Sequence, residues 1–226
     1  MVEAVIFDFD GTLVDSEPNY ALSDVAMVRR FGGSLTVSEH HDYIGVGADG
    51  FIAAMKERYG LTASHAEMRR VQEAEYLNLA LVHTPLFPEM ARLLVHLNAL
   101  RVPMAIASGS SLELLERLTE RNGIRKYFQV ILSSEAVERG KPAPDVFLET
   151  AQRLGVAPER CLVLEDSIAG CKAALAAGMA LIALPGEYQL DRLERFPQGG
   201  TLLPGGMKDF RCHMVLDRLA QSFFAD

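Results

Sequence analysis

The stretch of sequence that decides the fold is residues 5–12, which read VIFDFDGT. Its first three residues, Val5-Ile6-Phe7, form a wholly apolar run that stops at Asp8. Such a run is typical of a central strand in a parallel sheet, because a central strand is covered on both faces. We therefore expect a buried first strand that ends at an acidic residue.

Four later apolar runs are similar to the first, and helical patterns lie between them. Two of these helical patterns end at Gly155 and Gly178, in the position where a glycine commonly ends a helix. Strands that alternate with helices imply right-handed crossovers between parallel strands. The predicted fold class is therefore α/β, a Rossmann-like doubly wound parallel sheet. The additional strands are expected at residues 103–107, 130–132, 161–164 and 180–184.

The interval of residues 16–84 departs from this alternation. It carries three helical patterns and no run that predicts a strand. The third pattern opens with Ser64 and Glu67, whose spacing is that of a capping box. We expect this interval to form a helical domain inserted into an α/β core domain of residues 1–15 and 85–226.

Composition restricts the class of protein. The chain has 226 residues, of which 49% are hydrophobic and 23% charged, as is typical of a globular protein. No stretch approaches the ~20 apolar residues of a membrane span, and we expect neither a membrane segment nor a secretion signal. The three cysteines have no metal-ligand spacing, which predicts reduced thiols and a cytoplasmic location. The net charge of −8 argues against nucleic acids and anionic membranes as partners.

Polar residues follow four of the predicted strands. In a parallel sheet the carboxyl ends of the strands are where ligands bind, so we expect these residues to converge. Asp8 and Asp10 are two residues apart and project to the same side of an extended chain. The second strand is followed by a hydroxyl-rich turn that enters a helix, whose first amides suit an anion. The other strand ends carry the turn Ser108-Gly109-Ser110-Ser111 after the second strand, Lys141 after the third, and Glu165 and Asp166 after the fourth.

The expected site contains four carboxylates, which repel one another unless cations join them. Lys141 and a divalent metal that prefers oxygen ligands supply that charge. Mg²⁺ fits, because it takes few carboxylates and keeps room for water and a substrate phosphate. The residues predict a site for phosphoryl transfer, in which an aspartate attacks phosphorus and the product is later hydrolysed.

These residues resemble, in order, the four motifs of the haloacid dehalogenase (HAD) superfamily. The motifs are Asp8-x-Asp10-Gly11-Thr12, Ser108, Lys141 and Glu165-Asp166, and the resemblance spans roughly residues 4–185. The helical insert is similar to the cap domain of the β-phosphoglucomutase-like and sugar-phosphatase branch. The resemblance implies a Mg²⁺-dependent phosphatase that acts on a small phosphorylated metabolite, a sugar or polyol phosphate, as a monomer or small homo-oligomer.

The resemblance also implies a role for each residue. Asp8 is implied as the nucleophile that becomes aspartyl phosphate, and Asp10 as the general acid and base. Ser108, Gly109 and Lys141 are implied as phosphate-binding residues, and Lys141 also neutralises Asp8.

The implied metal ligands are Asp8, Asp166 and the backbone carbonyl of Asp10. Glu165 belongs to the same acidic group, either touching the metal or supporting those that do. Glu17 is implied as a substrate-facing residue where the cap joins the core. An exposed glutamate in the first turn of a helix is the alternative for Glu17.

Three other functions are weighed against the phosphatase. Phosphomutases of the β-phosphoglucomutase kind carry an arginine in the cap loop and a histidine at the start of the first cap helix. Here Ala48 and Tyr20 stand at those places, which disfavours a mutase. A haloacid dehalogenase is disfavoured by Asp10, since members with that activity lack this aspartate. A phospho-aspartate switch without enzymatic activity is disfavoured because receiver domains are about half this length and have no cap.

Other chemistry-bearing residues are expected to be structural. His40 and His41 have no metal-ligand partner nearby in the sequence, and we expect both in a surface loop. Met55 and Met68 are expected in the core of the helical domain, and Cys161 within a buried strand.

Overall fold

A computed structural model gives the structure of residues 2–43, 46 and 48–223, without the side chains of residues 187–188 and 221–223. The chain divides into two compact units. The core unit comprises Met1–Asp15 and Pro85–Asp226, and the helical unit comprises Ser16–Thr84. Among the described residues, no helix combines the length and apolarity needed to span a membrane.

The core unit is built on a parallel sheet of six strands in the order β3-β2-β1-β4-β5-β6. The chain builds the sheet outward on one side of β1 and then on the other, which confirms the predicted doubly wound α/β fold. Strand β1 is central and wholly buried, as its apolar run predicts. The strands are β1 (Ala4–Phe7), β2 (Met104–Ser108), β3 (Val130–Ser133), β4 (Cys161–Glu165), β5 (Ala180–Ala183) and β6 (Thr201–Leu202).

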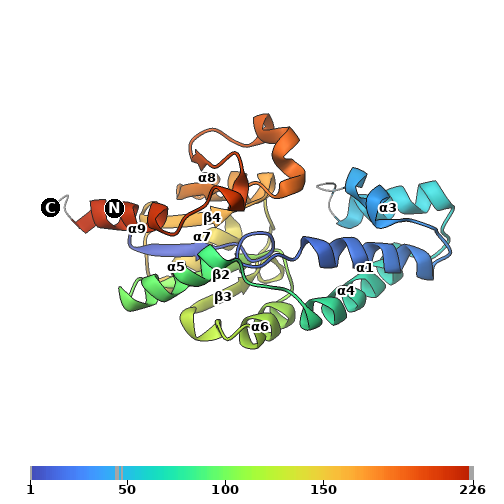
Figure 1. Cartoon of the computed structure of the whole chain (residues 1–226), viewed down its shortest axis with the longest axis horizontal. Coiled ribbons are helices and arrows are strands. Elements are labelled where there is room, and N and C mark those ends of the chain that lie inside the picture. The colour runs from blue at the N-terminus through green and yellow to red at the C-terminus, as the bar shows by residue number, and fades with distance from the viewer. Residues whose placement is uncertain (1, 44–45, 47, 224–226) are drawn as a thin grey trace. The chain divides into compact units, whose positions relative to one another are not determined.

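Helices cover both faces of this sheet. Because crossovers between parallel strands are right-handed, the connections on the two sides of β1 lie on opposite faces. Figure 1 shows α5 in front of the sheet and α7 behind it. Helix α7 packs against β2 and β3, α8 packs against β4 and β5, and α5 lies beside α9. The helices are α5 (Pro88–Ala99), α6 (Leu112–Arg121), α7 (Asp145–Leu154), α8 (Ile168–Ala176) and α9 (His213–Phe223).

The last strand, β6, has no counterpart among the predicted strands. It consists of Thr201 and Leu202, which pair in parallel with Ile182 and Ala183 of β5. Thr201 is exposed and the strand lies at the edge of the sheet, so the sequence has no buried apolar run here that would predict a strand. The described part of the chain ends with the helix α9.

The helical unit contains α1 (Glu17–Arg30), α2 (Val37–His40), α3 (Ala48–Tyr59) and α4 (His65–Val82). The expected capping box is present, since Ser64 and Glu67 each accept a hydrogen bond from the other's backbone N–H. Helices α1 and α4 pack along each other. The predicted burial of Met55 and Met68 is confirmed, since both are fully buried in the core of this unit.

The prediction that His40 lies in a surface loop is wrong. His40 ends α2 and is only 4% exposed, whereas His41 is exposed. The His40 Nε2 donates to Oδ2 of Asp24 at 2.7 Å, and Gln72 donates to the other oxygen of Asp24. The imidazole also packs edge-on against Phe51. The acceptor on α1 lies 16 residues earlier in the chain, so the neighbours of His40 in the sequence do not reveal it.

Candidate active site

The turn after β1 packs against the end of β4. Asp8 is buried, and its backbone N–H donates to Leu164 at 2.9 Å, which continues the sheet pairing by one residue. Gly11 has a φ of +75°, and a β-carbon there would lie 2.5 Å from an oxygen of Asp166. Only glycine fits this turn without displacing that carboxylate. The turn therefore holds the aspartates of β1 close to the acidic pair of β4.

Lys141 joins three strand ends through one ammonium group. Its Nζ lies 2.6 Å from Oδ1 of Asp8, 3.0 Å from the carbonyl of Ala107 and 2.7 Å from Oε2 of Glu165. Burial opposes the charged form, but the carboxylates of Asp8 and Glu165 nevertheless raise the pKa of Lys141. The lysine therefore carries a permanent positive charge among the acidic residues.

Three carboxylates meet beside this ammonium. Asp8, Glu165 and Asp166 each offer an oxygen, and these atoms lie within 4.8 Å of one another. Burial and the charge of Glu165 raise the pKa of Asp8 to about 8, against the effect of Lys141. Burial, Glu165 and Asp8 likewise raise the pKa of Asp166. A single ammonium does not balance this charge, and a set of oxygen donors suits a hard divalent cation such as Mg²⁺.

Glu165 is held on both of its oxygens. One oxygen accepts hydrogen bonds from the backbone N–H and hydroxyl of Ser167, at 2.9 and 2.8 Å, and the other accepts from Lys141. Gly170, in the first turn of α8, leaves the space that the carboxylate fills: a β-carbon there would lie 2.0 Å from it. Sequence reasoning did not identify Gly170, because a glycine inside a helix does not by itself indicate a contact.

The turn after β2 is connected to the turn after β1. Ser108 is buried, and its Oγ accepts from the backbone N–H of Ser110 at 3.1 Å. The Ser110 hydroxyl donates to Oδ2 of Asp10 at 2.5 Å. A β-carbon on Gly109 would meet nothing within 4 Å, so Gly109 borders open space. The contact of Ser110 with Asp10 was not predicted from the sequence.

The remaining predicted positions belong to the helical unit. Glu17 is the first residue of α1 and is partly buried. Tyr20 stacks on Tyr76, with 4.0 Å between ring centroids. Ala48 is the first residue of α3, but Gly45 and Gly47 of the preceding loop lie outside the described residues.

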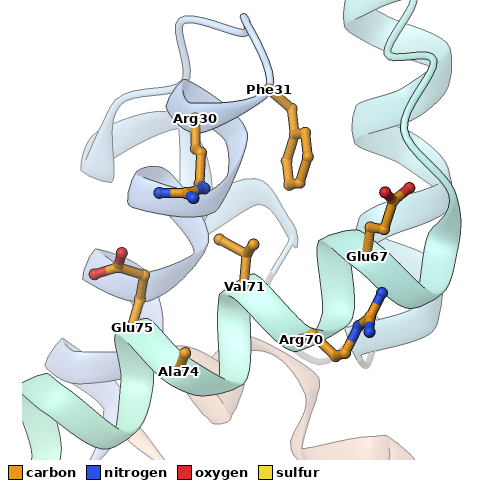
Figure 2. A pocket seen from close by; sticks show the side chains of 7 residues that line it. All are labelled: Arg30, Phe31, Glu67, Arg70, Val71, Ala74 and Glu75. Atoms are coloured by element: carbon orange, nitrogen blue, oxygen red, sulfur yellow. The ribbon is translucent and has the colours of Figure 1, made fainter.

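The helical unit also has a hollow of about 410 Å³ between the end of α1 and the first half of α4. Figure 2 shows Arg30 near Glu75 at one end and Arg70 near Glu67 at the other. The lining contains two arginines and two glutamates, so its charges balance. No predicted site residue lines it.

Comparison with known proteins supports the assignment made on the strand-end residues. A family model described as haloacid dehalogenase-like hydrolase matches residues 2–178. The chain is 34% identical over 188 residues to a probable pseudouridine-5'-phosphatase of Drosophila melanogaster, covering 80% of each protein. It is 31% identical over 182 residues to a phosphorylated carbohydrates phosphatase of Thermotoga maritima, covering 80% of this chain and 84% of the relative.

A solved structure is also similar over most of its length. A mutant of CbbY from Rhodobacter sphaeroides, in complex with xylulose-(1,5)bisphosphate, superposes with a TM-score of 0.78 and 28% sequence identity. The match covers 92% of this chain and 95% of that one. With the family model matching most of the chain, and with the parallel sheet and its strand-end carboxylates in place, this protein belongs to the haloacid dehalogenase-like hydrolases, in their sugar-phosphatase branch.

Proposed function

We propose that this protein is a Mg²⁺-dependent phosphatase that hydrolyses a small sugar or polyol phosphate through an aspartyl-phosphate intermediate at Asp8. Its relatives are named as phosphatases, and the chain is a phosphoric monoester hydrolase. The observation that carries the mechanism is the contact of Lys141 with both Asp8 and Glu165. It keeps a cation beside the proposed nucleophile, where a substrate phosphate brings further negative charge.

The proposed metal ligands are Asp8, Asp166 and the backbone carbonyl of Asp10, with Glu165 in the same acidic group. When bound, Mg²⁺ supplies positive charge that offsets the carboxylates and orients the phosphate. One oxygen of Glu165 accepts a hydrogen bond from Lys141, and the other accepts from Ser167. Through these bonds Glu165 also supports the site by holding Lys141 and Ser167 in place.

The reaction proceeds in two displacements. Asp8 attacks phosphorus with a carboxylate oxygen, the ester P–O bond breaks, and Asp10 gives its proton to the departing oxygen. Asp10 then takes a proton from the water that attacks the phosphoaspartate, and Asp8 is released with inorganic phosphate. Ser108 and Lys141 hold the oxygens of the phosphate that do not react. The buried Ser108 accepts from Ser110, so its own hydroxyl hydrogen is available to donate.

We propose that the helical unit acts as the cap that selects the substrate, and that Glu17 faces the substrate. The unit is inserted between β1 and α5, and its two connections leave the core unit side by side. The backbone N–H of Asp15 donates to the carbonyl of Pro85 at 2.9 Å, and Val14 pairs with Leu86 as an antiparallel bridge. Two adjacent chain segments form a natural hinge for a lid.

The decisive experiment is a screen of phosphorylated sugars, polyols and nucleosides with Mg²⁺, with release of inorganic phosphate as the measurement. Asp8→Asn is the matched control, because the amide is nearly isosteric but a poor nucleophile. We expect turnover by the wild type and less than about one hundredth of it in the variant. Activity of Asp8→Asn near the wild-type level would contradict the mechanism.

The competing function is that of a phosphomutase, and one substrate distinguishes a phosphomutase from a phosphatase. A mutase needs a cap cation for the phosphate that does not react, and Ala48 and Tyr20 provide none. With β-glucose 1-phosphate, we expect inorganic phosphate to form faster than glucose 6-phosphate, if this sugar is accepted. Predominant formation of glucose 6-phosphate, stimulated by a bisphosphate, would establish the mutase instead. Persistence of the phosphoaspartate after a single exposure to acetyl phosphate would indicate a switch.

A further inference from the structure

Ser110 is a strand-end residue that the proposed function does not use. It lies two residues beyond β2 and contacts two of the proposed functional side chains. Its hydroxyl donates to Oδ2 of Asp10 at 2.5 Å, and its backbone N–H donates to Oγ of Ser108 at 3.1 Å. Ser110 and Asp10 are 100 residues apart in the chain, so this contact exists only in the folded protein.

We propose that Ser110 is a positioning residue for Asp10, an inference that rests on the proposed phosphatase function. Its hydroxyl anchors Oδ2 of Asp10, and Oδ1 exchanges a proton with the substrate and with water. Asp10 is partly exposed and directly precedes Gly11, whose positive φ turns the chain at this point.

The chemistry of the hydroxyl suits both forms of Asp10. A carboxylate and a carboxylic acid protonated on Oδ1 both accept a hydrogen bond at Oδ2, so the anchor persists throughout the cycle. In the first displacement, the proton on Oδ1 passes to the leaving oxygen as the ester P–O bond breaks. In the second, a proton of the attacking water passes to Oδ1 as the phosphoaspartate bond breaks. Ser110 keeps its own proton in both steps.

The second contact of Ser110 aligns Asp10 with the phosphate. Its N–H occupies one acceptor position of the Ser108 hydroxyl, which fixes the oxygen that we propose binds the phosphate. One residue therefore sets both the group that holds the phosphate and the group that protonates its ester oxygen. A misplacement of about 1 Å in such an arrangement is enough to cost about a hundredfold in rate.

The test compares esters whose leaving groups differ in their need for a proton. In Ser110→Ala, we expect kcat/KM for an alkyl phosphate to fall about tenfold to hundredfold. For p-nitrophenyl phosphate we expect a fall of less than about threefold, because p-nitrophenolate departs without protonation. Ser110→Thr keeps a hydroxyl and should restore most of the loss.

Ser111→Ala is the matched control. The Ser111 hydroxyl accepts from the backbone N–H of Leu114 and caps α6, so its removal affects stability rather than Asp10. We expect a lower Tm with kcat/KM values for both esters near those of the wild type. If Ser110→Ala lowers kcat/KM for both esters by the same factor, or for neither, the positioning role is overturned.

A second measurement is independent of activity. Three-bond couplings of the β-protons of Asp10 report whether its side chain occupies one rotamer or several. We expect one rotamer in the wild type and averaging among rotamers in Ser110→Ala, with no averaging in Ser111→Ala. A single rotamer of Asp10 in Ser110→Ala would overturn the proposal. Inactivity of the wild type toward every ester would instead overturn the proposed function, and the couplings alone would then test whether Ser110 anchors Asp10.

Discussion

Gly170 and Glu165 occupy complementary positions at the end of β4: a β-carbon on residue 170 would lie 2.0 Å from the carboxyl group of Glu165. The glycine is in the first turn of α8, where any other residue would meet that buried carboxylate. The size of one side chain therefore determines where a charged group that contacts Lys141 can lie.

Gly170→Ala is expected to reduce activity without a large loss of stability. Alanine is favoured over glycine in a helix by about 1 kcal/mol, which opposes the cost of displacing Glu165. The displaced carboxylate would release Lys141, and we expect kcat to fall at least about tenfold. Gly140→Ala is the control, because a β-carbon there would lie 3.6 Å from Ser134, an ordinary contact. Equal activities of the two variants would contradict the argument.

The metal-free protein is expected to lose stability as the pH rises from about 5 to 8. Asp8 has a pKa of about 8 in the folded state, well above the value of about 3.9 for an unfolded chain. The folded state therefore binds more protons in this interval, so this contribution to the free energy of unfolding is lost as the pH rises through 8. We expect a slope on the order of 1 kcal/mol per pH unit from this group.

Urea unfolding in EDTA at several pH values measures this slope, and the difference between wild type and Asp8→Asn isolates the contribution of Asp8. Added Mg²⁺ should stabilise the protein more at pH 8 than at pH 5, because it binds the deprotonated carboxylates. If the difference between wild type and Asp8→Asn does not change with pH, burial and the neighbouring carboxylates do not raise the pKa of Asp8.

Asp24→Ala is expected to destabilise the helical unit. Asp24 accepts hydrogen bonds from His40 and Gln72, and all three side chains are buried. Its removal leaves two buried donors without their acceptor, at a cost of about 2–3 kcal/mol in the free energy of unfolding. Glu73→Ala is the control, since the pair of Glu73 with Arg69 is exposed and contributes less than about 0.5 kcal/mol. Chemical denaturation of both variants measures the two free energies of unfolding. Equal values would show that the buried cluster of Asp24, His40 and Gln72 contributes little to stability.

The two connections of the helical unit are expected to behave as hinges. Binding of a phosphate analogue such as a metal fluoride should slow amide hydrogen exchange near Asp15-Ser16 and His83-Pro85, because closure of a lid orders its connections. Amides of α9, far along the chain from both connections, serve as the reference. Tight binding of the analogue with unchanged exchange at both connections would mean that the helical unit is not a lid.

Much of the fold can be predicted from the sequence, because it depends on short-range patterns. The apolar run before Asp8 and the similar runs before Ser108 and Glu165 correspond to β1, β2 and β4. The capping box of Ser64 likewise marks the start of α4. In contrast, β6 is a two-residue edge strand with one exposed residue, and it lacks the buried run on which such a prediction depends.

The sequence by itself determined the parallel sheet and which residues follow its strands, because a buried run and the polar residue that ends it are neighbours in the chain. Only the tertiary structure decided how those residues contact one another. The anchoring of Asp10 by Ser110, the space that Gly170 leaves for Glu165, and the burial of His40 against Asp24 each depend on a partner from another element of the fold. The strength of such contacts depends on distance and burial, and neither is set until the sheet and helices have packed.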